Sequence, residues 1–378
     1  MNISDKRHTI KLETLTPVHI GSGAFLQNNV EFVEDKNENG DSDIYIIDPA
    51  KVVDIIGIPN IDTWVTAIEK EEDIKGLISR LGKRATPDRY SKRVLSNFAK
   101  LGPKTTLKEC IHDGRGIAYI PGSSIKGAIR TAVLASIAIE RREELGLKIK
   151  LNDKRFACSD VECELFGDTP FENIFRFLQV GDAYFDRYCE ISLNEINLNI
   201  TEKDSLIDIG KKQLIEAIAE EKESILTIKL ASEYAGHCAD RGKVKNLPKN
   251  IDTIENLFDT INSHTKRLIE EEIEYWNAVS EEHSDGEYYI ENLETLLARV
   301  NECKQGKQCV LRVGHASGWR FMTGAWSEEL PIFNSKIVPM ARPRNKENNY
   351  EMYDFPKTRR IGDDYSDILG FVKLTIVE

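Results

Sequence analysis

Apolar and polar residues alternate over several short stretches of the chain, as they do in strands with one buried face. In Thr9–Thr16, Ile10 and Leu12 alternate with charged residues until Pro17 ends the pattern. Similar patterns predict further strands at Val30–Val33, Ile44–Ile47, Thr105–His112, Ile117–Ile120, Phe175–Tyr184, Ile191–Ile200, Ile225–Leu230, Cys309–Val313 and Ile368–Val377. The acidic turn between the second and third of these stretches predicts a solvent-exposed hairpin tip.

Helical spacing dominates other parts of the chain. After Asp48-Pro49, the residues Trp64, Ile68, Ile74, Ile78 and Leu81 recur roughly as one face of a helix would require. Further helices are predicted at Asp88–Lys100, after Pro121, and at Lys203–Lys222, Ile254–Val279 and Asn292–Cys303, whereas the polar stretch Lys150–Thr169 predicts a loop. Strands and helices interleave without a regular βαβ period or a fixed repeat, which predicts an α+β protein with small antiparallel sheets and large helical insertions.

The composition is that of a globular protein, since 40% of the 378 residues are hydrophobic and 30% are charged. We expect two units, residues 1–200 with a helical insertion at about 49–103, and residues 201–378 with a helical segment at about 203–303. No apolar run is long enough to cross a bilayer, and the N-terminal residues do not have the pattern of a signal peptide, so we expect a cytoplasmic protein.

The seven cysteines do not have the spacing of a disulfide framework or of a zinc site. The closest pairs are Cys158 with Cys163 and Cys303 with Cys309, and neither pair has a neighbouring histidine or a second cysteine pair. We therefore predict no bound metal and no cofactor.

The net charge of −12 is unusual for a nucleic-acid-binding domain. The acidic residues gather around Glu216–Glu223 and Glu270–Glu294, in stretches predicted to be helical. Basic residues gather elsewhere, namely Lys83, Arg84, Arg89, Lys92, Arg93, Lys126, Arg130, Arg342, Arg344, Lys346, Lys357, Arg359 and Arg360. A local basic track of this kind is sufficient to hold phosphates.

The strongest candidate for such a track is the predicted helix start at Pro121. A strand ends there, Gly122 turns the chain, and Ser123 and Ser124 are suited to cap a helix. Lys126 and Arg130 are four residues apart, so both lie near the positive end of the helix, where backbone N–H groups bind anions. The alternative is an ordinary capped helix with solvated cations.

Three further segments are candidates for RNA contact. In Thr16–Gly23, His19, Gly21, Ser22 and Gly23 follow the first predicted strand, although the lone histidine is more often structural than catalytic. The glycine-rich segment Gly314–Gly324 contains His315, Gly318, Trp319 and Arg320, which could pass an RNA backbone and stack a base, or could equally form a tight loop with core aromatics. Lys357, Arg359 and Arg360 form a late basic stretch, which would favour a solvated loop if it stood alone.

No enzyme site is recognisable in the sequence. It has no phosphate-binding loop of the Walker type, no paired histidines at metal-ligand spacing and no nucleophile elbow. We therefore predict a protein that is not an enzyme and list no catalytic residues.

Taken in order, the four segments resemble the RAMP superfamily of CRISPR proteins, and in particular the fifth Csm subunit of type III-A effector complexes. The resemblance runs from Thr16 to Lys373 and leaves about 203–303 without a counterpart. It implies a ferredoxin-like, RRM-like core, possibly two such units. It implies a non-catalytic subunit that caps the crRNA 3′ end, contributes to crRNA 3′ maturation in antiviral defence, and contacts crRNA, other Csm subunits and especially the neighbouring backbone RAMP subunit.

Three alternatives remain open, and one of them is a purely structural subunit that binds protein and would show no RNA crosslinks in the assembled complex. The backbone RAMP subunit that cleaves target RNA is another, but about a hundred residues separate Gly23 from Pro121 here, and no aspartate near Asp35, Asp41 or Asp43 has a matching context. A stand-alone metal-dependent ribonuclease is the third.

Overall fold

The computed structural model describes residues 6–153, 155–201, 206–280, 286–341, 355–363 and 368–377. Its strands are β1 (Arg7–Thr14), β2 (Gly21–Gln27), β3 (Phe32–Lys36), β4 (Ser42–Ile47), β5 (Ser91–Asn97), β6 (Thr106–Cys110), β7 (Tyr119–Ile120), β8 (Leu178–Val180), β9 (Ala183–Tyr184), β10 (Glu190–Asn199), β11 (Ile207–Ile218), β12 (Glu223–Leu230), β13 (Gln308–Arg312), β14 (Thr358–Gly362) and β15 (Phe371–Ile376). Its α-helices are α1 (Pro49–Ile56), α2 (Ile61–Glu69), α3 (Ile74–Leu81), α4 (Pro87–Tyr90), α5 (Gly122–Glu140), α6 (Arg142–Gly146), α7 (Ser159–Phe166), α8 (Ser232–Ala239), α9 (Ile254–Ser280), α10 (Glu287–Asn301) and α11 (Val338–Ala341).

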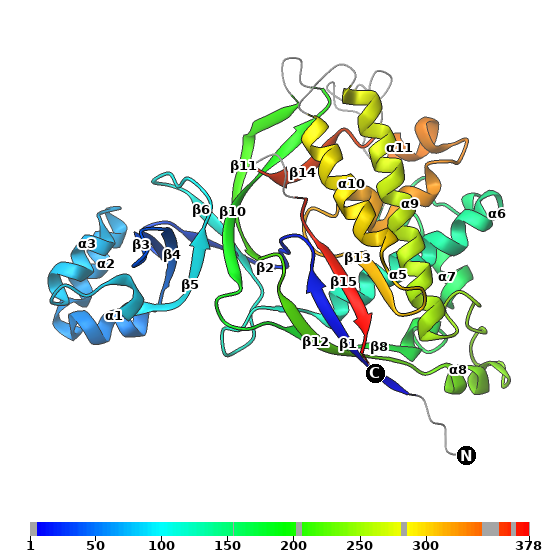
Figure 1. Cartoon of the computed structure of the whole chain (residues 1–378), viewed down its shortest axis with the longest axis horizontal. Helices are drawn as coiled ribbons and strands as arrows, with labels where there is room; N and C mark the ends of the chain where they lie inside the picture. Colours follow the sequence, from blue (N-terminus) through cyan, green and yellow to red (C-terminus); the bar gives the residue numbers. More distant parts are fainter. Residues whose placement is uncertain are drawn as a thin grey trace.

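The strands form two main sheets (Figure 1). The first has the order β13-β15-β1-β12-β8, and the second has the order β2-β6-β11-β10-β5-β4-β3, with β14 also paired to β10. The short strands β7 and β9 pair separately. The predicted mixture of helices and sheets is therefore confirmed, and the division proposed at residue 200 does not coincide with the division into sheets, because each sheet contains strands from both sides of it.

Strand β1 lies at the centre of the first sheet. It pairs antiparallel with β12 on one side and with β15 on the other, so Ile10 faces Leu226 across one ladder and Ile376 across the other. Ile10 and Leu12 are fully buried, as their alternation with charged residues predicts.

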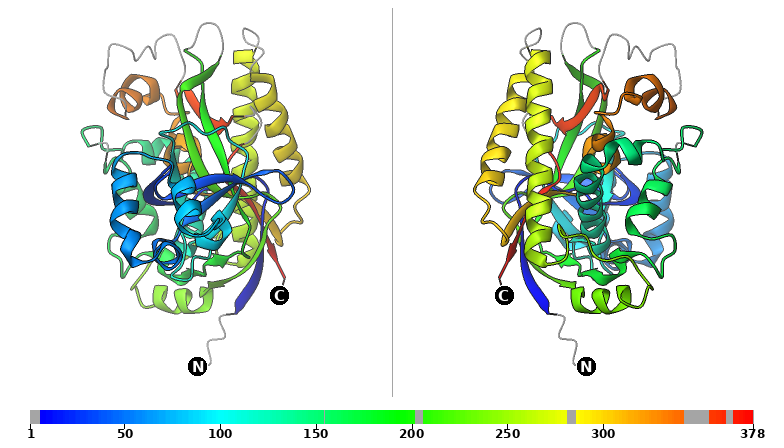
Figure 2. Two further views of the ribbon diagram at one scale, coloured as in Figure 1. Left: turned by 90° about the vertical axis from the view of Figure 1, so that its left-hand side faces the viewer. Right: turned by 90° about the vertical axis from the view of Figure 1, so that its right-hand side faces the viewer.

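Two long helices pack against this sheet. Ile125, Ile129 and Val133 of α5 are fully buried in one core with Leu12 of β1, which confirms the predicted helix after Pro121. Helix α9 packs beside α5 and β13, and α10 lies alongside α9 (Figure 2). None of the helices in the described ranges is both long and apolar enough to cross a membrane.

Helices α1 to α4 form a separate layer on β3, β4 and β5, at the left of Figure 1. Their core contains Val52, Trp64 and Ile78. The predicted helix at Asp88–Lys100 is wrong beyond its first turn, because β5 pairs with β4 and β10 and is extended. The predicted loop at Lys150–Thr169 likewise contains helix α7.

The predicted helix at Lys203–Lys222 is also wrong, because its described part contains the long strand β11. This strand lies between β6 and β10, and Leu214, Ile215, Ala217 and Ile218 are all buried. A strand covered on both faces loses the alternation that identifies strands in a sequence. The acidic Glu216 consequently lies inside the protein, with no exposed surface.

Candidate nucleic-acid interface

Two of the glycine-containing segments lie against each other in the fold. The backbone N–H of His315 donates to the carbonyl oxygen of His19 at 2.9 Å. Gly314 has φ of +77°, and a Cβ atom there would lie 2.5 Å from the same carbonyl oxygen. Only glycine therefore permits this close approach of the two segments without a shift.

The His19 ring is fully buried at this junction. Its Nδ1–H donates to the carbonyl oxygen of Glu216 at 2.6 Å, and its ring meets that of His315 edge to face at 5.4 Å between centroids. Burial lowers the pKa of His19 to about 4, so the ring is neutral at neutral pH. His19 therefore holds the two segments together, and its side chain is not available to contact RNA as predicted.

The late basic stretch joins the same junction, because its Arg360 contacts Glu195, a buried carboxylate on β10. His315 Nε2 donates to Glu195 at 2.7 Å and Arg360 donates to its other oxygen at 3.2 Å. Burial disfavours the charged carboxylate, but the hydrogen bond from His315 and the charges of His315, Arg360 and Lys108 outweigh it and lower the pKa of Glu195. Lys108 Nζ on β6 lies 3.2 Å from His315 Nδ1.

These contacts create an exposed surface beside the junction, which we call the glycine face: Gly21, Ser22, Gly23, Lys108, His315 and Gly318. Gly21, Gly23 and Gly318 are exposed, and a Cβ atom on Gly23 or Gly318 would have no atom within 4 Å. Ser22 donates to Glu109 at 3.1 Å. A strand edge and a loop without side chains leave room for a polynucleotide backbone, and Lys108 keeps N–H donors for a phosphate.

The start of α5 differs from the prediction. No serine side chain caps it; Pro121 occupies the capping position and the N–H of Gly122 donates to Asp182 at 2.7 Å. A carboxylate therefore already occupies the predicted phosphate position. Ser123 is exposed and Ser124 is partly buried.

The two cations of α5 are also engaged within the protein. Lys126 donates to the carbonyl oxygen of Leu178 at 2.7 Å, and burial together with the nearby Arg130 lowers its pKa. Arg130 forms an ion pair with Glu162 at 2.6 Å and lies over the ring of Phe166 at 4.6 Å. The structure thus places both cations away from a free phosphate site.

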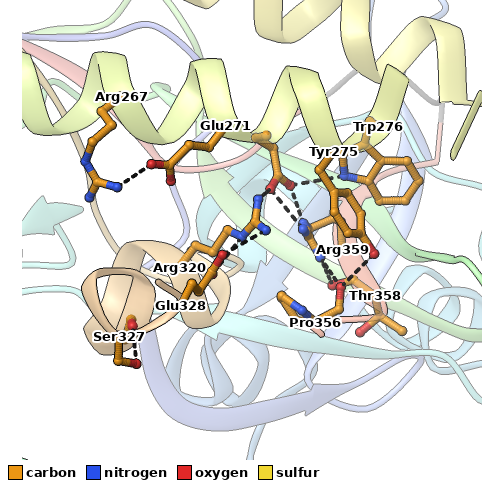
Figure 3. A network of polar contacts seen from close by, with 12 residues as sticks. Arg267, Glu271, Tyr275, Trp276, Arg320, Ser327, Glu328, Pro356, Thr358 and Arg359 are labelled. Atoms are coloured by element: carbon orange, nitrogen blue, oxygen red, sulfur yellow. Dashed lines mark hydrogen bonds and ion pairs between the residues drawn. The ribbon is translucent and has the colours of Figure 1, made fainter. Parts of the chain in front are cut away.

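Arg320 and Arg359 meet at a different buried carboxylate, Glu272 of α9. Figure 3 shows both arginines pointing to the same place beside Tyr275 and Trp276. Arg320 and Arg359 each donate to Glu272 Oε2 at 2.9 Å. Both arginines are less than a tenth exposed. The structure gives them a role inside the protein rather than the predicted contact with RNA.

Trp319 and Lys357 complete the predicted set. The Trp319 ring packs against Phe333 and Phe355, as the alternative of core aromatics in a tight loop predicts. Lys357 is partly buried, which lowers its pKa. The predicted basic residues Arg342, Arg344 and Lys346 lie outside the described residues.

One group of potential metal ligands was missed in the sequence: His112, Glu190 and Glu216. His112 Nε2 lies 2.5 Å from Glu190 Oε1, and Arg93 donates to Glu216 at 3.0 Å. Burial raises the pKa of Glu216, and the neighbouring Glu190 adds to the effect, although Arg93 opposes it. The contacts are those of a hydrogen-bonded ion cluster in which Arg93 supplies the cation. All seven cysteines are free thiols.

Comparisons with known proteins identify the family to which the chain is similar. The family model of the RAMP superfamily matches residues 11–321. The chain is similar to the "CRISPR system Cms protein Csm5" of Methanocaldococcus jannaschii, at 26% identity over 98% of this chain and 89% of that protein. This similarity confirms the predicted resemblance to the fifth Csm subunit.

Two solved structures have a similar fold. One is a chain of the cryo-EM structure of a Csm–crRNA–target RNA ternary complex of a type III-A CRISPR-Cas system, with a TM-score of 0.71, 20% identity, and coverage of 98% of this chain and 100% of that one. The other is the crystal structure of T. onnurineus Csm5, with a TM-score of 0.63, 21% identity, and coverage of 96% and 99%. The matched sequence and the shared fold lead to one conclusion: this chain belongs to the RAMP superfamily.

Proposed function

We propose that this chain is a crRNA-binding subunit of a type III-A CRISPR complex, that it caps the crRNA 3′ end, and that it has no nuclease site of its own. The observation that carries the proposal is the similarity to a Csm5 protein over nearly the whole of both chains. Because the similarity is not confined to one segment, it covers both the sheets and the helices α9 and α10, for which the sequence motifs offered no support.

The glycine face is the surface that we propose for the crRNA backbone. Its strand edge and its loop come from opposite ends of the sequence and are joined by the His19–His315 contact. The net charge of −12 repels RNA from most of the protein, so the local cation Lys108 must act together with a partner subunit that extends the basic track. We therefore expect weak RNA binding by the free chain and tight binding by the assembled complex.

The test is to reconstitute a type III-A complex with and without this chain and to sequence the crRNA 3′ ends. We expect defined 3′ ends with the chain and longer, heterogeneous ends without it. Identical 3′ ends in both preparations would refute the proposed role.

A matched pair of variants locates the surface. Lys108→Glu should weaken crRNA retention in the complex and reduce the dependence of binding on salt by about one phosphate contact. Arg241→Glu, an exposed cation on the turn after α8, is the control and should change neither. Equal retention by both variants would move the RNA path away from the glycine face.

The absence of a nuclease site is tested separately. The purified chain is incubated with single-stranded RNA and Mg²⁺ or Mn²⁺, with and without chelator. We expect no cleavage above that of a mock purification. Cleavage that disappears after substitution of a single acidic residue or histidine would favour the ribonuclease alternative.

A further inference from the structure

A polar pocket lies on the second sheet and shares no lining residue with the glycine face. It has a volume of about 270 Å³ and is lined by three parts of the chain: the α1 and β5 region, the turn at residues 115–118, and the turn at residues 186–190. The four segments that suggested RNA contact in the sequence contribute none of its lining residues. Its size is close to the lower end of the range for small-ligand sites, about 300 Å³.

Two of the residues that line this pocket are cations without an ion-pair partner among the described residues. Lys92 and Arg187 are exposed, and neither side chain has a hydrogen-bond or ion-pair partner in the part of the chain that the structure describes. They come from β5 and from the turn before β10, so the fold brings them together across about a hundred residues of sequence. Two unpaired cations beside one concave surface are suited to bind a phosphate group.

The interior of the pocket has the opposite charge. Glu190 lines it and is only 6% exposed. His112 Nε2 holds its Oε1 atom at 2.5 Å, and its Oε2 atom accepts no hydrogen bond from the described residues. A carboxylate oxygen fixed in this way can accept a hydrogen bond from the amino or imino group of a nucleobase.

An aromatic side chain stands beside these groups. Tyr188 is 79% exposed, it lines the pocket, and its ring contacts no other ring in the described ranges. Its φ angle is +67°, a conformation that L residues other than glycine, asparagine and aspartate adopt rarely. An exposed tyrosine held in a strained backbone conformation beside a cation is suited to stack on a base.

We propose that this pocket binds one unpaired nucleotide of single-stranded RNA. The base stacks on Tyr188 and directs an N–H group to Glu190, and its phosphate meets Lys92 and Arg187. The proposal rests on the proposed function and deepens it, because it adds a second RNA contact separate from the glycine face. A free phosphate ion fits less well because Glu190 and Asp186 repel it, and a metal ion fits less well because Lys92, Arg93 and Arg187 repel it.

The experiment uses the complex assembled with a crRNA that carries 4-thiouridine at successive positions near its 3′ end. After irradiation, crosslinked peptides are mapped by mass spectrometry. We expect a crosslink to the peptide that contains Tyr188. Tyr188→Ala should lower the yield of this crosslink. It should also weaken the binding of a short single-stranded RNA about 5- to 150-fold, as expected for the loss of one stacked base.

Further variants separate the contacts from one another. Lys92→Ala with Arg187→Ala should reduce the slope of log affinity against log salt by about 0.7, since the two side chains hold one phosphate and each phosphate contact on a single strand contributes about 0.7. Tyr288→Ala, which removes a 59% exposed tyrosine from α10, is the control and should change neither yield nor affinity. The altered side chains in all these variants are exposed, so we expect their melting temperatures to equal that of wild type. Measuring these temperatures checks that each variant is folded.

The outcomes distinguish this proposal from the one that it rests on. Crosslinks to the glycine face without any to residues 186–190 would overturn the pocket and leave the proposed function standing. No crosslink to this chain at any position would overturn the proposed function, and the pocket with it. Equal affinities for wild type and Tyr188→Ala would also overturn the pocket.

Discussion

Two buried glutamates, Glu272 and Glu216, have opposite electrostatic surroundings. Glu272 is 2% exposed and receives hydrogen bonds from Arg320, Arg359 and the hydroxyl of Tyr289. Burial alone would raise its pKa, but the charges of Arg359 and Arg320 outweigh burial and lower the pKa to about 2. The carboxylate is ionised at neutral pH, and Glu328, which pairs with Arg320 at 3.0 Å, brings a second carboxylate to the two arginines.

Glu216 is fully buried, and among the described residues it pairs with one arginine, Arg93, which it shares with Glu109. Burial and the nearby Glu190 raise its pKa to about 7. Both glutamates are buried and paired with arginine, so a count of ion pairs would not show that their pKa values shift in opposite directions. Glu272 is buried and pairs with two arginines, whereas the Glu216 cluster has excess negative charge and its outermost carboxylate, Glu190, faces a pocket that is also lined by Lys92 and Arg187.

The largest expected effect concerns Glu272. Glu272→Gln leaves the buried Arg359 without its carboxylate partner and leaves Arg320 with Glu328 alone, so we expect the free energy of unfolding to fall by about 3–5 kcal/mol at pH 7. The control is Glu271→Gln, whose ion pair with Arg267 lies nearer the surface and should contribute less than about 1 kcal/mol. Urea unfolding measures both. If Glu272→Gln lowered the free energy of unfolding by less than about 1 kcal/mol, the buried Glu272 pairs would contribute no more than the exposed Glu271–Arg267 pair.

The second prediction concerns the opposite pH dependence of the two glutamates. The folded pKa of Glu216 is above its ordinary value of 4.5, so the folded state binds more protons between about pH 7 and pH 4.5. From pH 8 to pH 5, wild type should therefore gain on the order of 2–3 kcal/mol relative to Glu216→Gln. The Glu272 contribution has the reverse sign, because it is present above about pH 4.5 and is lost as the pH falls toward 2.

Urea unfolding at the two pH values measures the difference. Glu291→Gln on the exposed face of α10 is the control, and its stability should parallel that of wild type. Parallel curves for Glu216→Gln and wild type would mean that Glu216 remains ionised in the folded protein.

The smallest expected effect compares two tyrosines. Tyr289 is 1% exposed and donates to Glu272 at 3.0 Å, so Tyr289→Phe should lower the free energy of unfolding by about 1.5 kcal/mol. Tyr188→Phe in the exposed pocket should change it by less than about 0.5 kcal/mol. A larger loss for Tyr188→Phe than for Tyr289→Phe would reverse the assignment of structural and binding roles.

The sequence predicted the elements with a clear period. Ile125, Ile129 and Val133 recur every fourth residue and identified α5, and the alternation around Ile10 identified β1. It failed at β5 and β11, where pairing with distant strands overrides local preference. The order of the motifs also identified the superfamily, since order along the chain is a property that the sequence shows directly.

The candidate site was predicted less well, because a sequence does not show which residue a charged side chain will pair with in the folded protein. Glu272 belongs to an acidic stretch that was predicted to be helical, and it is the residue that pairs with Arg320 and Arg359 inside the protein. Glu190 and Glu216 lie on adjacent strands, and no local pattern brings them together with His112. These contacts depend on long-range pairing, which spacing along the chain cannot reveal.

The central position of β1 has a consequence for biosynthesis. Its two neighbours in the sheet are β12, about two hundred residues later, and β15, which ends at Ile376. During translation β1 emerges well before both of its partners, so one of its hydrogen-bonding edges stays open until the ribosome has passed β15. At about 5–20 residues per second this interval lasts tens of seconds, during which the open edge of β1 can pair with another chain.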